Sequence, residues 1–437
     1  MLTLEKVFYI IISTTLVTVF ILFTFVFSPN SVNNSSKVKT IYFADNISKA
    51  HQAIIDLFNK KYEGQIKVET INLPFEKFST NERKELLARY LRSKSNRIDI
   101  FSVDIIWVPR FAKWSLSLDS MMDSTKLKRL LPYALNSCSY NGKLYAVPLY
   151  IDIALMFYRD DMLKQLPEYD QFTKELSQSI TWQRFFDLQK KLKNMDEKFY
   201  VFQADDYEGL LCSFTELMSN LNSKIISTNE RHLSFDEGNA TKAIRSLYDL
   251  IYQKKSSPSK VVQLRENSSY QYFVTNDCFS VRGWPNFLSK DNIYLNMDLL
   301  NKIKPAPLPH LAGSKPASVF GGWNLMVSKY SEKIPEVMKF LDFIMSDEAQ
   351  KILYQEENFL PVVKTLYEDV DFITKYPELN YYNNLFKTGV YRPFLEEYTN
   401  ISDILSEQIN KALKKEITIY EAVKLASEKI SEKITLD

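Results

Sequence analysis

The chain has 437 residues with 55 basic and 53 acidic side chains, which gives a formal net charge of +2 at pH 7. This balance, without a long basic block, excludes a protein that binds nucleic acid mainly through charge. The length allows two or three domains. Aromatic residues are abundant at 14%, whereas the nine glycines fall well under the roughly 7% of average composition, so each glycine indicates a backbone requirement more strongly than usual.

A long apolar run near the N-terminus predicts where the protein works. Val7 to Phe27 contains 21 residues without a charge, about 31 Å as a helix at ~1.5 Å per residue, which is enough to cross a bilayer. The residues around Ser28 lack the small side chains of a signal-peptide cleavage site, and no cysteine follows that could carry a lipid. We therefore expect residues 1–28 to anchor the protein on the extracytoplasmic face of a membrane. The alternative is that this segment is a cleaved signal peptide. Residues 29–39 would form a polar tether between the membrane and the folded part of the chain.

Alternating strand and helix patterns over residues 40–103 predict a mostly parallel sheet that helices cover on both faces. Apolar residues recur at helical spacing from Ala50 to Phe58, and alternation marks Ile66 to Thr70 as a half-exposed strand. Ligands of such sheets bind beyond the carboxyl ends of the strands, and Asp104 directly follows a buried strand. The expected elements are strands at 40–44, 66–70 and 98–103 and helices at 50–58 and 81–91.

The stretch from Asn141 to Asp161 contains the residue that points most directly to a ligand. The run Ile151 to Tyr158 is so apolar that we expect a strand buried on both faces, yet Asp152 places a carboxylate inside it. Burying a carboxylate costs free energy unless cations pair with it or donors form hydrogen bonds to it, and sugar hydroxyls are such donors. Tyr150 offers a flat apolar surface for a pyranose ring. The alternative is a structural role, in which Asp152 accepts backbone N–H bonds or pairs with a buried arginine.

The second half of the chain adds helices and two turns that each contain a tryptophan. Thr181 is a suitable N-cap for an amphipathic helix that begins at Trp182. A turn at 282–285 would push Trp284 outwards, and a Gly-Gly-Trp turn at 321–323 precedes a strand at 324–327. A glycine pair in a glycine-poor chain indicates close backbone approach or a positive φ. Other expected elements are a strand at 199–202, a helix that ends near 221, helices at 239–251 and 335–345, and two helices over 403–434.

The cysteines and histidines give no support for a metal site or a histidine-based catalytic site. They are scattered singly, and no cysteine pair has the spacing of a zinc site. We interpret the cysteines as small buried hydrophobic residues, with one disulfide as a minor alternative. The residues concerned are Cys138, Cys212, Cys278, His51, His232 and His310.

Six motifs in the same order resemble those of the extracellular solute-binding proteins of carbohydrate ABC importers, and within them the trehalose/maltose-binding branch. The resemblance covers the chain from about Ile41 to the C-terminus. It is carried by residues 141–160, by Thr181-Trp182, and by 199–216, 282–286, 320–329 and 392–402. It implies an α/β, two-lobed periplasmic-binding-protein fold of type II, in which each lobe is a mostly parallel sheet flanked by helices. One lobe would comprise residues 38–150 and 305–346, and the other residues 151–304 and 347–437.

The resemblance also implies a ligand site between the lobes. Its expected members are Asp104, Asp152 and Arg392 for hydrogen bonds to sugar hydroxyls, Tyr150, Trp284 and Trp323 for stacking on sugar rings, and Gly321 and Gly322 for close approach of backbone N–H groups. Core packing is the alternative for both tryptophans. The chain departs from the family pattern at Asn46 and Asn286, so the sugar itself is left open.

The function implied by the resemblance is capture of an oligosaccharide, for example the disaccharide trehalose or maltose. The two lobes would close over it, and ABC permease subunits in the membrane would receive it. We expect a monomer without a catalytic residue, cofactor or metal. Two alternatives are a membrane-anchored sugar sensor and a glycoside hydrolase that uses Asp104 and Asp152, since glycoside hydrolysis needs paired carboxylates.

Overall fold

A computed structural model describes residues 38–74, 80–94, 96–229, 232–289 and 294–434, together with Thr15, Val17 and Thr18. The predicted membrane segment Val7 to Phe27 lies, apart from these three residues, outside the described part of the chain. None of the helices among the described residues combines the length and the apolar character that crossing a bilayer requires.

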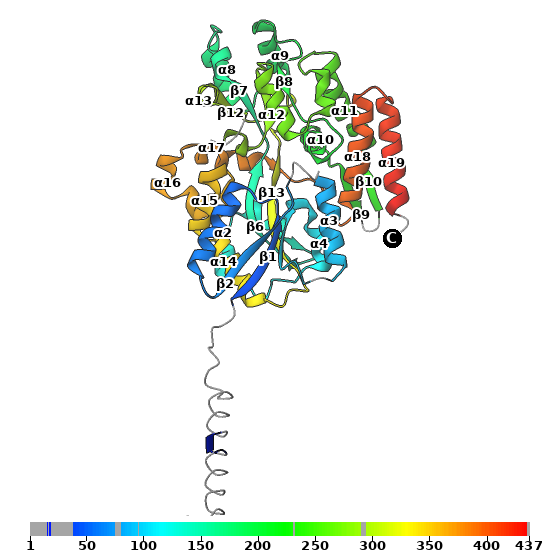
Figure 1. Cartoon of the computed structure of the whole chain (residues 1–437). Coiled ribbons are helices and arrows are strands. Elements are labelled where there is room, and N and C mark those ends of the chain that lie inside the picture. Colours follow the sequence, from blue (N-terminus) through cyan, green and yellow to red (C-terminus); the bar gives the residue numbers. More distant parts are fainter. Residues whose placement is uncertain are drawn as a thin grey trace, which may run out of the picture.

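The first sheet has six strands and joins segments that are far apart in the sequence (Figure 1). These strands are β1 (Lys39–Asp45), β2 (Ile66–Asn72), β3 (Ile100–Asp104), β6 (Ala146–Ile153), β13 (Ser318–Val327) and β14 (Gly389–Val390). As predicted, β1 pairs in parallel with β2 and with β3. β13 then runs antiparallel to both β3 and β6, and β14 pairs in parallel with β13. The carboxyl end of β3 therefore lies beside the middle of β13.

The second sheet has four strands, and the prediction of a mostly parallel sheet is wrong for it. Its strands are β7 (Leu155–Arg159), β8 (Tyr200–Val201), β11 (Ser280–Gly283) and β12 (Ile303–Ala306). β7 runs antiparallel to β11 and to β12, while β11 and β8 are parallel. The apolar run of residues 151–158 predicted burial correctly, but an apolar run says nothing about strand direction. A single residue separates the end of β6 from the start of β7, so one extended segment supplies a strand to each sheet.

Helices cover the first sheet, and two of them begin at a serine N-cap. In α2 (Lys49–Lys61), the Ser48 side chain caps the N-terminus by accepting from the His51 N–H, and Ile54, Ile55 and Phe58 are buried. α2 packs against α15 (Asp347–Glu357), which begins at the N-cap Ser346. The other long helices of this layer are α3 (Thr80–Arg92) and α14 (Ile334–Ile344).

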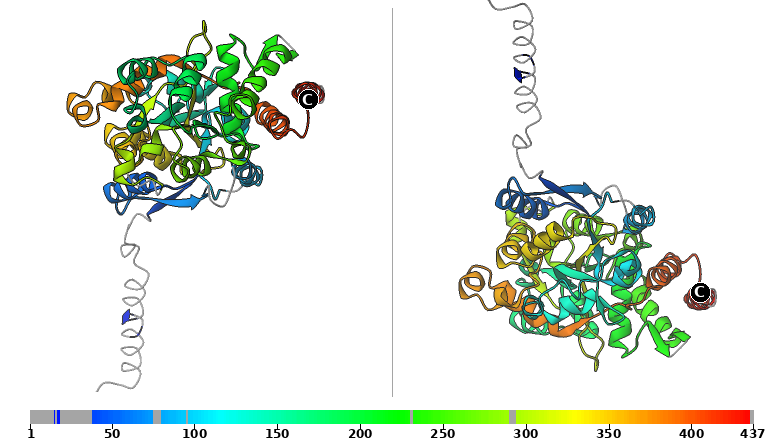
Figure 2. Two further views of the ribbon diagram at one scale, coloured as in Figure 1. Left: turned by 90° about the horizontal axis from the view of Figure 1, so that it is seen from above. Right: turned by 90° about the horizontal axis from the view of Figure 1, so that it is seen from below.

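The second sheet lies among helices that Figure 1 shows at the opposite end of the molecule from β1 and β2. Thr181 caps α9 by accepting from the Arg184 N–H, as the sequence predicted. At one edge of the molecule, the C-terminal helices Tyr398–Leu413 and Ile419–Ile434 lie side by side, and both pack on the helix Glu237–Tyr252 (Figure 2). The helices are α8 (Tyr169–Ser177), α9 (Trp182–Lys191), α10 (Glu208–Asn220), α11 (Glu237–Tyr252), α12 (Glu266–Thr275), α18 (Tyr398–Leu413) and α19 (Ile419–Ile434).

The strand pairings and helix contacts show which sheet the residues near the predicted lobe boundaries belong to. Residues 151–153 belong to β6 in the first sheet, and residues 305–306 belong to β12 in the second. Helix α15 packs on α2 and so lies with the first sheet. The division into 38–150 with 305–346, and 151–304 with 347–437, stays a prediction.

Two local predictions differ from the structure. The Gly-Gly-Trp segment at 321–323 is not a turn, because β13 continues through it with a β-bulge after Trp323. Residues 266–275 form α12, a helix that the sequence analysis did not predict. The three cysteines are free and buried, which confirms their interpretation as small core residues.

The remaining helices and strands are short connecting elements. They are α4 (Val108–Phe111), α5 (Ser124–Lys128), α6 (Pro132–Leu135), β4 (Ser139–Tyr140), β5 (Lys143–Leu144), α7 (Asp160–Leu163), β9 (Ile226–Asn229), β10 (His232–Phe235), α13 (Met297–Leu300), α16 (Val370–Lys375) and α17 (Glu378–Leu385).

Candidate functional site

A cavity of about 540 Å³ lies where elements of the two sheets meet, and all eight residues predicted for the ligand site line it. Its volume falls within the roughly 300–1,000 Å³ that is usual for small-molecule sites. The first sheet contributes residues from β3, β6 and β13. The opposite wall comes from α10, from α12 and from the segment after β11. The predicted members are Asp104, Tyr150, Asp152, Trp284, Gly321, Gly322, Trp323 and Arg392.

Strand register explains why residues so distant in sequence converge. In β13, Trp323 pairs with Asp104 of β3 on one side and with Tyr150 of β6 on the other. Gly321 pairs with Asp152 in the same ladder. Directly opposite residues on neighbouring strands have their side chains within contact distance, so the central strand gathers the first-sheet half of the site.

The glycine pair is required by its surroundings. A Cβ atom on Gly321 would lie 2.8 Å from Cζ3 of Trp284, so the indole of the opposite wall occupies the space of a side chain. Gly322 has φ +118°, and a Cβ there would lie 2.5 Å from the carbonyl oxygen of Tyr150. The prediction of a positive φ is thus correct for Gly322, while the approach of a ligand to these N–H groups stays a prediction.

Arg392 connects the two walls of the cavity. Its Nη2 donates to Asp104 Oδ1 at 2.8 Å and its Nη1 donates to Glu208 Oε1 at 2.8 Å, and the arginine is only 3% exposed. Burial opposes the positive charge, but the Asp104 and Glu208 carboxylates outweigh it and hold the pKa of Arg392 well above its usual value. Glu208 also accepts from the hydroxyls of Tyr398 and Ser402. Glu208 is therefore a structural anchor at the junction as well as a lining residue.

Among the described acids that line the cavity, Asp152 has a buried carboxyl oxygen without a hydrogen bond. Its Oδ1 is buried and has no hydrogen-bond partner among the described residues. Burial, and secondly the charge of Asp104, raise the pKa of Asp152 well above its usual value. A raised pKa favours the protonated form, and a protonated carboxyl group can donate one hydrogen bond to a hydroxyl group as well as accept one.

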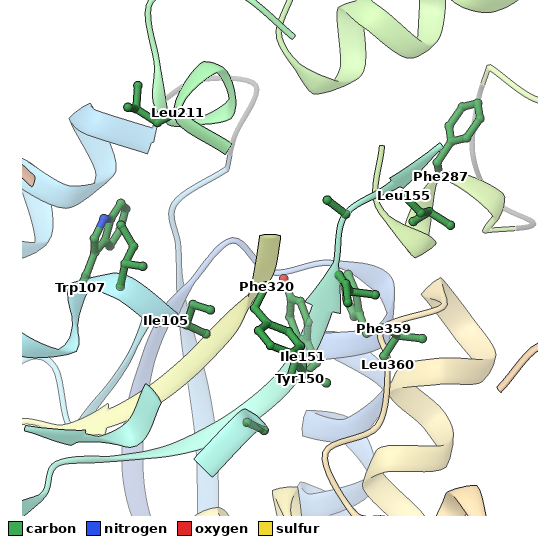
Figure 3. Packing of buried hydrophobic residues seen from close by; sticks show 14 of the residues in the cluster. Ile105, Trp107, Tyr150, Ile151, Leu155, Leu211, Phe287, Phe320, Phe359 and Leu360 are labelled. Carbon is green, nitrogen blue, oxygen red and sulfur yellow. The ribbon is translucent and has the colours of Figure 1, made fainter. Parts of the chain in front are cut away.

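The aromatic residues of the site are each supported from behind. The ring of Tyr150 is stacked on Phe359, with centroids 4.1 Å apart and planes within 8°, so Phe359 covers one of its faces (Figure 3). Trp107 is buried and meets Trp323 edge-on at 5.7 Å. Trp284 and Trp323 are half-buried and line the cavity, unlike a tryptophan enclosed in a core.

Twelve lining residues were not predicted from the sequence as site members, and half of them lie on α12 or directly before it. Helix α12 presents its first turns to the cavity, and burial raises the pKa of the Glu266 carboxyl group. The available signal was a run of hydrogen-bonding residues at 265–268 just before an aromatic pair. The lining residues not predicted as site members are Tyr207, Glu208, Gly209, Cys212, Arg265, Glu266, Asn267, Ser268, Tyr270, Gln271, Asn286 and Tyr294.

Metal chemistry has no counterpart in the described part of the chain. No group of histidine, cysteine, aspartate and glutamate side chains there could hold a metal ion. The lining groups instead suit a neutral polar ligand, because they combine hydrogen-bonding side chains with aromatic faces.

Comparison with known proteins places the chain in a family. The family model described as bacterial extracellular solute-binding protein matches residues 44–351. A probable ABC transporter-binding protein of Deinococcus radiodurans is 24% identical over 363 residues, which cover 82% of this chain and 84% of the relative.

Solved structures share the fold over nearly the whole chain. Maltose-bound MalE3 of T. maritima is similar with a TM-score of 0.80 and 25% identity, over 91% of this chain and 100% of that one. An ABC transporter solute-binding protein of Thermotoga lettingae, bound with α-D-tagatose, has a TM-score of 0.76 and 21% identity, over 91% and 100% of the two chains. The two-lobed α/β fold expected from the sequence is therefore correct.

Proposed function

Because the chain belongs to the family of bacterial extracellular solute-binding proteins, we propose that it is the substrate-binding component of an ABC-type sugar importer. It binds an oligosaccharide in the cavity between its lobes and delivers it to permease subunits in the membrane. This family binds solutes and does not transform them, so no residue is assigned a catalytic role and Asp104 and Asp152 are not a hydrolytic pair.

The single observation that supports sugar binding most strongly is the composition of the cavity wall. Two half-buried indoles, Trp284 and Trp323, face the same space as the under-satisfied carboxyl group of Asp152. A sugar presents C–H faces that pack on aromatic rings and hydroxyls that donate to and accept from a carboxyl group. The arginines of the same wall are already paired, Arg392 with Asp104 and Glu208 and Arg265 with Asp205, so the wall favours a neutral ligand over an anion.

A disaccharide such as maltose or trehalose is the proposed ligand. The similar structure of MalE3 contains maltose. A cavity of about 540 Å³ is in the middle of the range for small-molecule sites. Its two tryptophans come from opposite walls, so a ligand can pack against an aromatic surface on each side.

Closure of the lobes over the ligand is the proposed mechanism. The contacts of Arg392 with both walls are those that closure would form. Its guanidinium bonds Asp104 from the first sheet and Glu208 from α10 at the same time. Lys84–Asp403 at 3.1 Å and Lys113–Glu396 at 2.6 Å join the same two sides. A ligand that contacts both walls binds the closed form better than the open form and so shifts the population towards it.

Membrane attachment completes the proposal. Residues 7–27 would anchor a monomer beside its permease on the extracytoplasmic face of the membrane and raise its effective concentration there. Protease protection and fractionation of membranes with the full chain would test the anchor.

Calorimetric titration of the full chain in mild detergent tests the function. We expect saturable, one-to-one binding of maltose or trehalose and no binding of a uronic acid or sugar phosphate of similar size. Absence of binding across a set of neutral mono- and disaccharides would contradict the proposal.

A further inference from the structure

We propose that a small inner pocket, separate from the ligand cavity, binds one water molecule that joins α9 to α10. The described residues that line the inner pocket include Trp182, Ser213, Glu216, Asn220, Leu308 and Pro309. None of its described lining residues also lines the ligand cavity. The inference therefore goes beyond the proposed function and does not depend on whether a sugar binds.

The volume of the inner pocket suits a single water molecule. It is about 20 Å³, and a site needs roughly 10–15 Å³ of such space to hold one water. Sites for organic ligands are far larger, at roughly 300–1,000 Å³. The inner pocket therefore admits water and excludes a second sugar.

Two buried polar groups in the lining of the inner pocket have no hydrogen bond within the described chain. They are the indole N–H of Trp182 and the hydroxyl of Ser213, a residue that is only 5% exposed. Buried polar groups without a partner cost free energy, so the great majority in native proteins bond to protein or to ordered water. A water in the inner pocket can reach both groups because both residues belong to its wall.

Ser213 differs in this respect from a neighbour on the same helix. The hydroxyl of Thr215 donates to the Leu211 carbonyl oxygen, one turn earlier in α10, at 2.6 Å. Ser213 makes no such bond to the backbone of the described helix. Its hydroxyl is therefore left for a partner outside the helix backbone, and the inner pocket is the space that Ser213 borders.

The indole of Trp182 is held in one orientation by aromatic neighbours. Its ring centroid lies 5.9 Å from that of Phe186, in a stacked arrangement, and 5.6 Å from that of Tyr200, edge to face. The ring of Phe185 meets it edge-on as well. Turning the N–H toward another acceptor would break these contacts, so the acceptor has to lie in the inner pocket.

Glu216 supplies the acceptor that such a water needs. A carboxylate offers about four lone-pair sites. In the described part of the chain three of them are used, by Arg282 Nη2 at 2.7 Å, Arg282 Nε at 3.0 Å and the Val319 N–H at 3.3 Å. A water that accepts from Trp182, donates to Glu216 and shares a hydrogen bond with Ser213 makes three bonds, the usual number for a buried water.

The groups around the inner pocket select a neutral molecule. The indole N–H of Trp182 can only donate, so it does not suit a metal cation. The carboxylate of Glu216 disfavours an anion, and Arg282 already pairs with that carboxylate. A water is neutral and both donates and accepts, so it matches the three groups.

The inner pocket lies where the two sheets connect. Leu308 and Pro309 belong to the segment that leads from β12 of the second sheet to β13 of the first. Val319, which donates to Glu216, is in β13. The water therefore extends the hydrogen-bond network of this junction from β13 through Glu216 to α9.

A crystal structure of the full chain in detergent, without sugar, is the first test. We expect density for one water within about 3.2 Å of Trp182 Nε1, Ser213 Oγ and a carboxylate oxygen of Glu216. A well-ordered inner pocket without that density would overturn the proposal, and so would a direct hydrogen bond between Trp182 and Ser213.

A double-mutant cycle measured by urea unfolding is the second test. Trp182→Phe and Ser213→Ala each remove one partner of the same water, so the double variant should lose less stability than the sum of the two single losses. The control cycle pairs Trp182→Phe with Thr215→Val, because the Thr215 hydroxyl bonds its own helix and Thr215 is not among the described lining residues. The losses in the control cycle should add.

Additive losses in both cycles would overturn the proposal. If Trp182→Phe fails to fold, the crystal structure of the wild type decides alone, since it requires no variant.

Discussion

Trp284 lies directly on Gly321, so close that the ring fills the place where a side chain at residue 321 would begin. The two residues come from opposite walls of the cavity, since Gly321 is in β13 and Trp284 follows β11 of the second sheet. The absence of a side chain at one residue thus determines where the stacking surface of the other lies.

Gly321→Ala should therefore displace the indole of Trp284. The added Cβ would lie 2.8 Å from Cζ3 and 3.0 Å from Cη2 of the ring. Overpacking of this kind costs about 1–3 kcal/mol, which corresponds to a loss of sugar affinity of roughly 5- to 140-fold if the cost falls on the bound state. Calorimetry measures it.

Gly238→Ala is the matched control for this substitution. Gly238 lies in α11, and an added Cβ there meets one atom, Asp236 Oδ1, at 3.7 Å. Its affinity should equal that of the wild type. Equal affinity of Gly321→Ala and Gly238→Ala would show that Trp284 does not depend on Gly321.

Asp152 should make the stability of the protein fall as the pH rises. Burial, and then Asp104, raise its pKa in the folded state, so the folded protein binds this proton more tightly than the unfolded chain does. The unfolded value is about 3.9, and the stability lost to ionisation grows from about pH 4 up to the raised folded pKa. Asp152→Asn removes that loss. Urea unfolding at pH 4, 6 and 8 should show the variant gaining on the wild type as the pH increases.

Asp119→Asn provides the opposite sign for comparison. A hydrogen bond from Ser117 and one from the Leu144 N–H lower the pKa of Asp119, so its stabilisation is lost as the pH falls through the folded pKa. This variant should therefore lose equally at pH 6 and pH 8 relative to the wild type, and less at pH 4. A pH profile of Asp152→Asn parallel to that of the wild type would contradict the environment assigned to Asp152.

Arg392→Met should destabilise the protein strongly. It leaves two partly buried carboxylates, Asp104 and Glu208, without their shared cation, and breaking a buried ion pair in this way costs about 3–5 kcal/mol. The control is Arg129→Met, because the Arg129–Asp347 pair is equally short at 2.6 Å but has side chains that are 45% and 44% exposed. Such surface pairs contribute about 0–1 kcal/mol. Similar losses for both variants in urea unfolding would refute the bridging role of Arg392.

The sequence predicted the members of the site better than their interactions. Asp104 and Asp152 could be singled out locally, as an acid after a buried strand and an acid inside one, whereas the complete set of eight, with Trp284, came from the resemblance to the family. Their convergence depends on the register of β13, which no local pattern encodes. For the same reason, the antiparallel direction of β7 could not be predicted.

Arg83 and Arg392 show the limit most clearly. Arg83 sits in an ordinary amphipathic helix pattern, and only the packing of α3 brings it over Trp323. Arg392 was predicted to bind sugar hydroxyls, but in the structure its Nη groups donate to Asp104 and Glu208. Partners that lie far apart in sequence determine the surroundings of both side chains.

The most direct test of the central claim is titration of the full chain with maltose and trehalose, carried out in parallel on Trp284→Ala and Trp182→Phe. Trp182 packs in an aromatic cluster with Phe185 and Tyr200, away from the cavity, and so controls for the loss of an indole. Buried aromatic contacts of this kind contribute about 2 kcal/mol or more, so Trp284→Ala should bind at least roughly 30-fold more weakly, while Trp182→Phe binds like the wild type. Equal affinity of Trp284→Ala and the wild type would contradict the assignment of the cavity as the sugar site.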